Sequence, residues 1–247
     1  MRRRFFVEEF RNGRAALNGA AAHHLGRVLR AEPGQSYELS DGQAVWLARV
    51  ERVERDAVEF ALVAPVAARE SRLRATLLLA IVKFERFEWA LEKATELGVR
   101  TVVPLAAERS EKALVGAAAK RAERWTRILL ESAQQARCLR PPVLRPLVSA
   151  ADGFRASDAS IKVLLSERDS AAGLRGVLQV ELGQEDGTGR ERVDLSLGVG
   201  AEGGWTDAEF AAAASAGFRE AALGGNILRT ETAVVAGLAA AHLYFDD

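Results

Sequence analysis

The first 70 residues of the chain alternate hydrophobic and polar positions over short runs. Runs with a period of two residues predict β-strands that bury one face. Asp41-Gly42 stands between two of them and is a strong signal for a hairpin turn. We therefore expect a small β domain over residues 1–70. Its expected strands read FFVEEF (5–10), YELS (37–40), AVWLARVERV (44–53) and AVEFALV (57–63).

Residues 71–247 follow a different pattern, in which apolar runs alternate with amphipathic segments. The run ATLLLAIVK (75–83) is almost continuously apolar, which is typical of a strand buried on both faces of a parallel sheet. Residues 84–97 place apolar side chains on one stripe and end before Gly98, so they predict a helix. This alternation predicts an α/β fold, a mostly parallel sheet with helices on both faces. Further expected elements are strands at 102–105 and 161–165, a helix at 120–137, and a mobile, Gly-rich excursion at 170–192.

The stretch from Asp194 to Tyr244 contains two strand–loop–helix units in tandem. In the first unit, an apolar strand at 195–199 leads into a Gly-rich loop. Thr206 and Glu209 then have the spacing of a capping box, which starts a helix. In open α/β sheets, ligands bind at the carboxyl ends of the strands. The loop is therefore a candidate ligand site.

The second unit repeats this arrangement with a weak strand at 221–223 and a loop that carries Gly224 and Gly225. Thr230 is the expected N-cap of the helix that follows. That helix is nearly all apolar over 233–244, so we expect it to be buried. Glycines on both loops would let a flat ligand reach bare backbone N–H and C=O groups, although tight turns also collect glycine.

Gly198, Gly200 and Gly203 spell G-x-G-x-x-G after a strand, which is the dinucleotide fingerprint when it opens a βαβ unit. Two observations argue against that interpretation. The capping box starts the helix after the motif rather than within it. Too little chain follows Gly204 to build the remaining strands of a dinucleotide fold.

Composition narrows the functional classes. The formal net charge is zero, so no global field attracts nucleic acid, but residues 1–30 hold seven Arg against two Glu. Cys138 is the only cysteine, which excludes an intrachain disulfide and indicates a reducing compartment. His23 and His24 are adjacent and their side chains diverge, so we expect no metal site. We see no signal peptide and no convincing membrane span, and expect a cytoplasmic protein.

Two motifs in the C-terminal units carry a family resemblance. VGAEGGWTDAE (199–209) and LGGNILRTETA (223–233) resemble the signature of the ribosomal RNA small subunit methyltransferase E family. Where that family usually has Gly-Pro-Glu-Gly-Gly, this chain has Ala201 in place of the proline. Residues around the two upstream helices match the family pattern as well: Lys83, Glu88, Glu92, Lys93, Glu96, Glu131, Gln135 and Arg137.

The resemblance implies an enzyme that transfers a methyl group from S-adenosylmethionine to N3 of one uridine in the 16S rRNA of the small ribosomal subunit. It also implies a SPOUT-type fold, in which the carboxyl end of the 71–247 domain is threaded as a trefoil knot. A PUA-like β-barrel over residues 1–70 would help to hold RNA. The family resemblance further implies a homodimer with the active site at the subunit interface.

Candidate site residues follow from the same resemblance. Arg229 would stabilise the deprotonated uracil or grip a phosphate, and Glu202 or Glu231 would accept the N3 proton. Glu231 is equally well explained as a first-turn helix residue, and Glu202 as a loop acid that bonds backbone amides. The implied cofactor residues are Leu165, Ser166, Gly198, Val199, Gly200, Glu202, Gly203, Gly204, Leu223, Gly224, Ile227 and Leu228. The implied RNA contacts are Arg2, Arg3, Arg4, Arg27, Arg30, Lys83, Gln135 and Arg137.

Two other functions stay open at this point. One is an RNA-binding protein of the same fold that serves as a dimeric scaffold and has lost catalysis; Ala201 is the feature that favours it. The other is a nicotinamide-dependent enzyme, which the glycine spacing suggests. For the arginines near the amino terminus, a solvated basic face is the alternative to RNA contact.

Overall fold

The computed structural model describes residues 3–68, 71–183 and 192–246. The chain divides into two compact units. The first comprises Met1–Glu70 together with Ala133–Pro141, and the second comprises Ser71–Ser132 together with Pro142–Asp247. None of the helices in the described part is long and apolar enough to cross a membrane.

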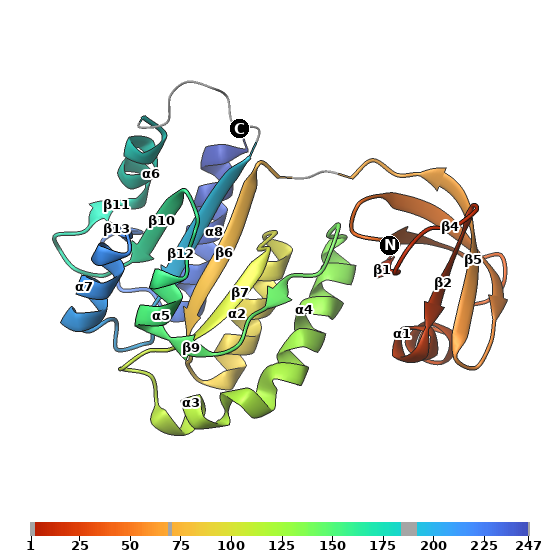
Figure 1. Ribbon diagram of the computed structural model, residues 1–247, viewed down its shortest axis with the longest axis horizontal. Coiled ribbons are helices and arrows are strands. Elements are labelled where there is room, and N and C mark those ends of the chain that lie inside the picture. The colour runs from red at the N-terminus through yellow and green to blue at the C-terminus, as the bar shows by residue number, and fades with distance from the viewer. Residues whose placement is uncertain (1–2, 69–70, 184–191, 247) are drawn as a thin grey trace. The chain divides into compact units, whose positions relative to one another are not determined.

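The first unit is built on a curled sheet whose described strands have the order β1-β3-β4-β5-β2 (Figure 1). All neighbours are antiparallel except β1 and β3. The predicted hairpin at Asp41 is confirmed, because its Oδ1 accepts hydrogen bonds from the amides of Gln43 and Ala44 between β3 and β4. The elements are β1 (Arg4–Phe6), β2 (Arg14–Asn18), α1 (Gly19–His23), a π-helical turn (His24–Val28), β3 (Ser36–Ser40), β4 (Val45–Val53) and β5 (Ala57–Pro65).

The second unit contains a parallel sheet of described strands in the order β11-β13-β10-β12-β6-β7-β8, with β9 paired to β7. The predicted α/β architecture is therefore confirmed. Its elements are β6 (Leu73–Ala80), α2 (Phe84–Glu96), β7 (Thr101–Ala106), α3 (Lys112–Ala118), a 3-10 turn (Ala119–Arg121), α4 (Ala122–Ala136), β8 (Val143–Leu144), β9 (Val148–Ser149), α5 (Ala150–Arg155), β10 (Ile161–Leu165), β11 (Ala172–Gly173), α6 (Leu174–Gly183), β12 (Val193–Val199), α7 (Asp207–Ser215), β13 (Arg219–Ala222) and α8 (Thr230–Phe245).

Strand β6 is the centre of the core. Leu77, Leu78 and Leu79 are all buried, although successive side chains of a strand point to opposite faces. This burial on both faces is the one predicted from the apolar run. Helices α2, α6 and α8 pack together in one layer, while α5 and α7 pack together in the other (Figure 1).

Strand β12 lies between β10 and β6, both of which precede it in the chain. Helix α8 then packs against α2, which follows β6 directly. The last part of the chain is therefore inserted among elements formed from its earlier parts. A knotted carboxyl end requires this kind of late insertion.

Three local predictions were wrong. Residues 174–183, expected within a mobile excursion, form helix α6 with Val177 and Leu178 buried; the rest of that excursion, 184–191, lies outside the described residues. The N-cap of α8 is Arg229 rather than Thr230. Helix α8 is also not buried on all sides, because Leu243 is 70% exposed.

Candidate active site

A cavity of about 470 Å³ lies where β10, β12 and β13 end, at the sheet edge predicted from the sequence. Its volume falls in the range of small-molecule sites. Loops 165–171, 199–207 and 222–230 bound it. The sequence-predicted cofactor residues that line it are Leu165, Ser166, Val199, Gly200, Glu202, Gly204, Leu223, Gly224, Ile227 and Leu228.

Gly198 and Gly203, also predicted cofactor residues, are not part of the cavity lining. A Cβ at Gly198 would approach Leu164 Cδ1 to 2.8 Å, so this glycine serves close packing inside the sheet. Gly203 offers its carbonyl to Arg109 Nη1 at 2.6 Å. Helix α7 begins only at Asp207, so the glycine pattern does not open a helix as the dinucleotide fingerprint does.

Trp205 fixes the loop after β12. Its side chain is buried, and Nε1 donates a hydrogen bond to the carbonyl of Leu165 at 3.1 Å. The indole packs edge-on against Phe154, with ring centroids 5.4 Å apart. A Cβ at Gly200 would lie 3.1 Å from the indole ring, a tight contact that could be relieved only by a shift of Trp205 or of the loop. One residue therefore ties the loops after β10 and β12 together.

The end of this loop is held by the predicted capping box, which the structure confirms. Thr206 Oγ1 accepts from the amide of Glu209, and Glu209 Oε2 accepts from the amide of Thr206. The other carboxylate oxygen of Glu209 accepts from the amide of Glu108 at 2.9 Å. Gly204 has a φ of +70°, a left-handed conformation that favours glycine. The loop is thus fixed from both ends.

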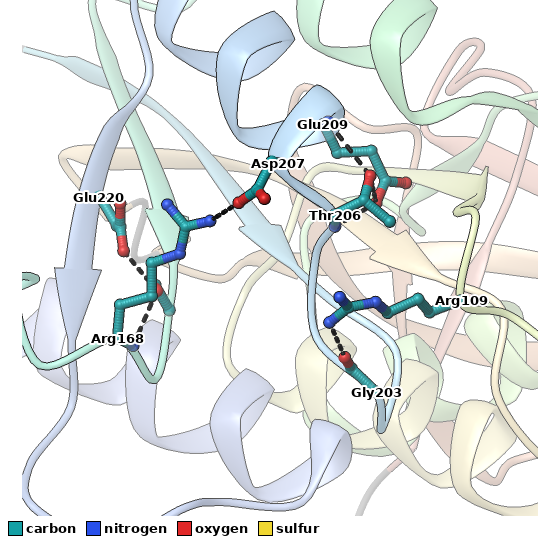
Figure 2. A network of polar contacts seen from close by, with 8 residues as sticks. Arg109, Arg168, Gly203, Thr206, Asp207, Glu209 and Glu220 are labelled. Atoms are coloured by element: carbon teal, nitrogen blue, oxygen red, sulfur yellow. Dashed lines mark hydrogen bonds and ion pairs between the residues drawn. The ribbon is translucent and has the colours of Figure 1, made fainter.

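Loop 165–171 is bonded to the start of α7 through the ion pair between Arg168 and Asp207, which Figure 2 shows. Ser166 Oγ donates to Glu220 Oε1 at 2.6 Å and accepts from the amide of Arg168. The Arg168 guanidinium pairs with Asp207 and lies 3.6 Å above the ring of Phe210. The backbone amide of Ser166 also donates to the carbonyl of Ala221 at 2.9 Å, so both its hydroxyl and its amide shape this turn.

The loop after β13 is the exposed wall of the cavity. Ile227 is 78% exposed and Leu228 is 37% exposed, although both are large apolar side chains. Gly224 has a φ of +146°, and a Cβ placed there or at Gly225 would meet no atom within 4 Å. Below it, Thr230 Oγ1 donates to the carbonyl of Gly200 at 3.0 Å, which links the start of α8 to the other glycine loop.

Acidic side chains outnumber basic ones in the cavity lining among the described residues. The acids are Glu167, Asp169, Glu202 and Asp207, and the bases are Arg109 and Arg168. Arg168 is paired with Asp207. The cavity therefore favours a cationic ligand over a polyanionic one.

Comparison with known proteins agrees with this geometry. The RNA methyltransferase domain family matches residues 69–242, and the RNA methyltransferase PUA domain family matches residues 17–63. Ribosomal RNA small subunit methyltransferase E of Synechocystis sp. is 31% identical to this chain, over 94% of this chain and 74% of its own length. The chain belongs to the ribosomal RNA small subunit methyltransferase E family.

Two solved structures extend this similarity to the fold. The methyltransferase E of Neisseria gonorrhoeae, bound to S-adenosyl methionine, is 28% identical with a TM-score of 0.83, over 99% of this chain and 98% of its own. A putative methyltransferase of Legionella pneumophila in complex with the same cofactor is 28% identical with a TM-score of 0.82, over the same shares. The predicted PUA-like domain and methyltransferase fold are thereby confirmed.

The catalytic residues implied by the methyltransferase E resemblance are not all at the cavity. Glu202 lines it. Arg229 is exposed at the N-cap of α8 and is not part of the lining, and Glu231 points its carboxylate toward Arg86 of α2. Sequence reasoning missed Arg86, which pairs with both acids, and Arg109, which lines the cavity. No spacing signal links these arginines to the motif, because they come from other elements.

The candidate RNA contacts of the methyltransferase E resemblance fall into two groups. Arg4 is buried: Nη2 pairs with Glu38 Oε2 at 2.9 Å and Nη1 donates to the carbonyls of Arg137 and Cys138. Its predicted role as an RNA contact is therefore replaced by a structural one, which ties residues 137–138 to the barrel. Arg2 lies outside the described residues. Those with exposed positions are Arg3, Arg27, Arg30, Lys83, Gln135 and Arg137.

Proposed function

We propose that this protein transfers a methyl group from S-adenosylmethionine to N3 of one uridine in the 16S rRNA of the small ribosomal subunit. The observation that carries the proposal is the acid-rich cavity between two glycine loops, in a chain of the methyltransferase E family. The relatives named above bear that activity class in their names, and two solved structures hold the cofactor.

The cavity residues fit S-adenosylmethionine. Its sulfonium and ammonium groups are cationic, and Glu167 and Asp169 supply negative charge to the lining, whereas the charge of Glu202 is offset by Arg86. Gly200 and Gly224 leave backbone accessible for the adenine edge, and Leu223, Ile227 and Leu228 offer apolar surface to its faces. A dinucleotide carries two phosphates, which this excess of carboxylates disfavours. When bound, S-adenosylmethionine supplies an electrophilic methyl group for in-line displacement.

The residues of the chain have to position the uracil and remove its N3 proton. Glu202 is the candidate acceptor that lines the cavity, so it is the stronger candidate for the base. Arg229, exposed at the start of α8, would stabilise the uracil anion or grip a neighbouring phosphate. Most of the rate enhancement would come from fixing both reactants in an arrangement that excludes water.

A homodimer is part of the proposal. Apolar side chains stay exposed on two helices that pack together: Leu243 on α8 is 70% exposed, and Trp89 on α2 is 44% exposed. Exposed apolar surface of this kind favours association. Exposed Arg27 and Arg30 in the PUA-like unit, together with Arg3, would contact rRNA phosphates in the cytoplasm.

A catalytically inactive scaffold is the second candidate, and Ala201 is the feature that favours it. Ala201 is 8% exposed, and its carbonyl accepts from the amide of Gly204 at 2.8 Å. The loop thus keeps a hydrogen-bonded turn without the family proline, and this supports the enzyme rather than the scaffold.

The test is incubation with methyl-labelled S-adenosylmethionine and small ribosomal subunits from cells that lack this protein, followed by nucleoside mass analysis. We expect label in 3-methyluridine. Label in a different nucleoside would overturn the N3 assignment. Absence of both labelling and cofactor binding would favour the scaffold. The Arg229→Ala variant is expected to lose transfer while keeping cofactor affinity, because Arg229 lies outside the cavity lining.

A further inference from the structure

Arg86, on helix α2, contacts both acids that the sequence assigns to the catalytic step. Its Nη1 donates to Glu202 Oε1 in the loop after β12. Its Nε lies 3.9 Å from Glu231 Oε1 on the first turn of α8. One guanidinium therefore joins a helix of the core, a loop of the cavity and the helix that follows the second glycine loop.

We infer that Arg86 is a positioning residue that holds loop 200–205 in the shape that receives the cofactor. The inference rests on the proposed function. Glu202 lines the cavity, whereas Arg86 and Glu231 are outside its lining. Arg86 does not reach the cavity itself. Its guanidinium pairs with the Glu202 side chain, so it acts on the cofactor by fixing the loop that carries Glu202.

The burial of Glu231 explains why a cation is needed at this point. Its side chain is only 15% exposed, and Oε2 has no hydrogen-bond partner among the described residues. A buried carboxylate without a counter-charge is costly. Arg86 supplies that charge. Without it, Glu231 and Glu202 would repel each other, and Glu202, which is 45% exposed, would move toward solvent with its loop.

The shape of the guanidinium matters as well as its charge. Arg86 uses two different nitrogens, Nη1 and Nε, for two carboxylates that come from separate elements. A lysine ammonium is a single point charge and does not reproduce this fork. Arg86→Lys should therefore keep part of the electrostatic effect and lose the fixed geometry.

The experiment compares Arg86→Ala and Arg86→Lys with a matched control, Arg124→Ala. Arg124 also pairs with a glutamate of α2, since its Nη2 lies 2.8 Å from Glu88 Oε2, but neither residue lines the cavity. Calorimetry would give the dissociation constant for S-adenosylmethionine, and assays on small subunits would give kcat and KM. We expect Arg86→Ala to raise Kd and KM by about tenfold. We also expect an intermediate rise for Arg86→Lys and wild-type values for Arg124→Ala.

Each outcome separates the inference from the proposed function. If the wild-type protein does not bind S-adenosylmethionine, the proposed function fails first. If it binds and Arg86→Ala binds equally well, the positioning role is wrong. A fall in kcat with KM unchanged would place Arg86 in the chemical step instead.

A second variant keeps the test valid if Arg86→Ala is unstable. Glu231→Gln removes the buried charge that Arg86 neutralises, so the double variant Arg86→Ala/Glu231→Gln should regain thermal stability. It should regain cofactor affinity only in part, because Glu202 is no longer repelled by Glu231 but still lacks its anchor. Full recovery of affinity in the double variant would show that Arg86 serves only the fold.

Discussion

The loops that follow β12 and β13 bound the same cavity, but the first makes many contacts with neighbouring residues and the second makes few. The first is fixed by the indole of Trp205, the carboxylate of Glu209 and the guanidiniums of Arg86 and Arg109. The second stands largely in solvent, with Ile227 78% exposed. In sequence the two loops look alike, since each is a glycine-bearing connection between a strand and a helix. The comparison teaches that the first loop is a preformed wall, whereas apolar side chains of the second are left for a ligand to cover.

The largest expected effect tests this contrast through stability. Trp205→Ala should lower the free energy of unfolding by about 3–5 kcal/mol, because it opens a cavity beside Phe154 and breaks the bond to Leu165. Ile227→Ala should change it by less than about 0.5 kcal/mol, since its side chain packs on little. Urea denaturation of both variants measures the two values. Similar losses at the two positions would refute the contrast.

The next effect concerns the glycines. Gly204→Ala places a side chain at a φ of +70° and 3.3 Å from Glu167 Oε1. Relief of this strain, about 1–2 kcal/mol, requires the loop to shift away from the shape that receives the cofactor, and this shift should weaken S-adenosylmethionine binding by about tenfold. At Gly225 a Cβ meets no atom within 4 Å, so Gly225→Ala should cost less than about threefold. Equilibrium binding gives both ratios, and a larger loss at Gly225 would mean that the second loop is the more constrained wall.

A smaller effect is expected at the junction between the loop after β12 and helix α7. Glu209 is buried, and its two oxygens accept from the amides of Thr206 and Glu108. Glu209→Gln replaces one acceptor with a donor, so one amide loses its partner at a cost of about 1–2 kcal/mol. Thermal unfolding would show the loss, with exposed Glu108→Gln as the control because only the Glu108 backbone takes part. No loss would mean that Trp205, Arg86 and Arg109 fix the loop without Glu209.

The smallest effect lies at the far end of α8, the helix that follows the exposed loop. Partial burial opposes the charge of Asp246, but hydrogen bonds from His242, Ser71 and the amide of Arg72 outweigh it and lower the pKa of Asp246. A lowered folded pKa stabilises the protein above the ordinary aspartate pKa of about 3.9, and the gain is lost as the pH falls through the folded value.

Asp246→Asn should therefore reduce Tm slightly at pH 7, by the equivalent of less than about 1 kcal/mol, because the site is partly solvated. The difference from the wild-type protein should shrink as the pH falls below the ordinary aspartate pKa. Melting curves across that range check the prediction. A difference that grows toward acid would mean that the charge of Asp246 is not what anchors the helix.

Much of the second unit could be predicted because its strands are strongly apolar. The apolar run ATLLLAIVK predicts the buried strand β6, and the capping box of Thr206 and Glu209 predicts the start of α7. Strand β2 was missed because RAALN has only two buried positions, and α6 was missed because its surroundings are rich in glycine and charge. The hydrophobic pattern of the sequence does not predict an element when it is the packing of neighbouring elements, rather than its own composition, that determines its structure.

The candidate site divides in the same way. Its glycines stand in the two motifs together with Glu202 and Asp207, so the cavity and most of its lining could be located from sequence, whereas Glu167 and Asp169 lie outside both motifs. The arginines could not be assigned, because a side chain's partners depend on the folded arrangement. Arg4, one of several arginines near the amino terminus, is buried on Glu38, while Arg86 looks like a solvated helix charge and contacts two acids of the site.

The place of β12 between β6 and β10 has a consequence for synthesis. A nascent chain emerges from its amino terminus, so β6 and β10 are available long before residues 193–199 arrive. Until then β6 lacks one neighbour and β10 lacks both, since β13 (Arg219–Ala222) is made later still, and unpaired strand edges are sites for aggregation or proteolysis. We expect fragments that end before Val193 to be rapidly degraded. The cavity, whose walls follow β10, β12 and β13, comes into existence only after residues 222–230 have been made.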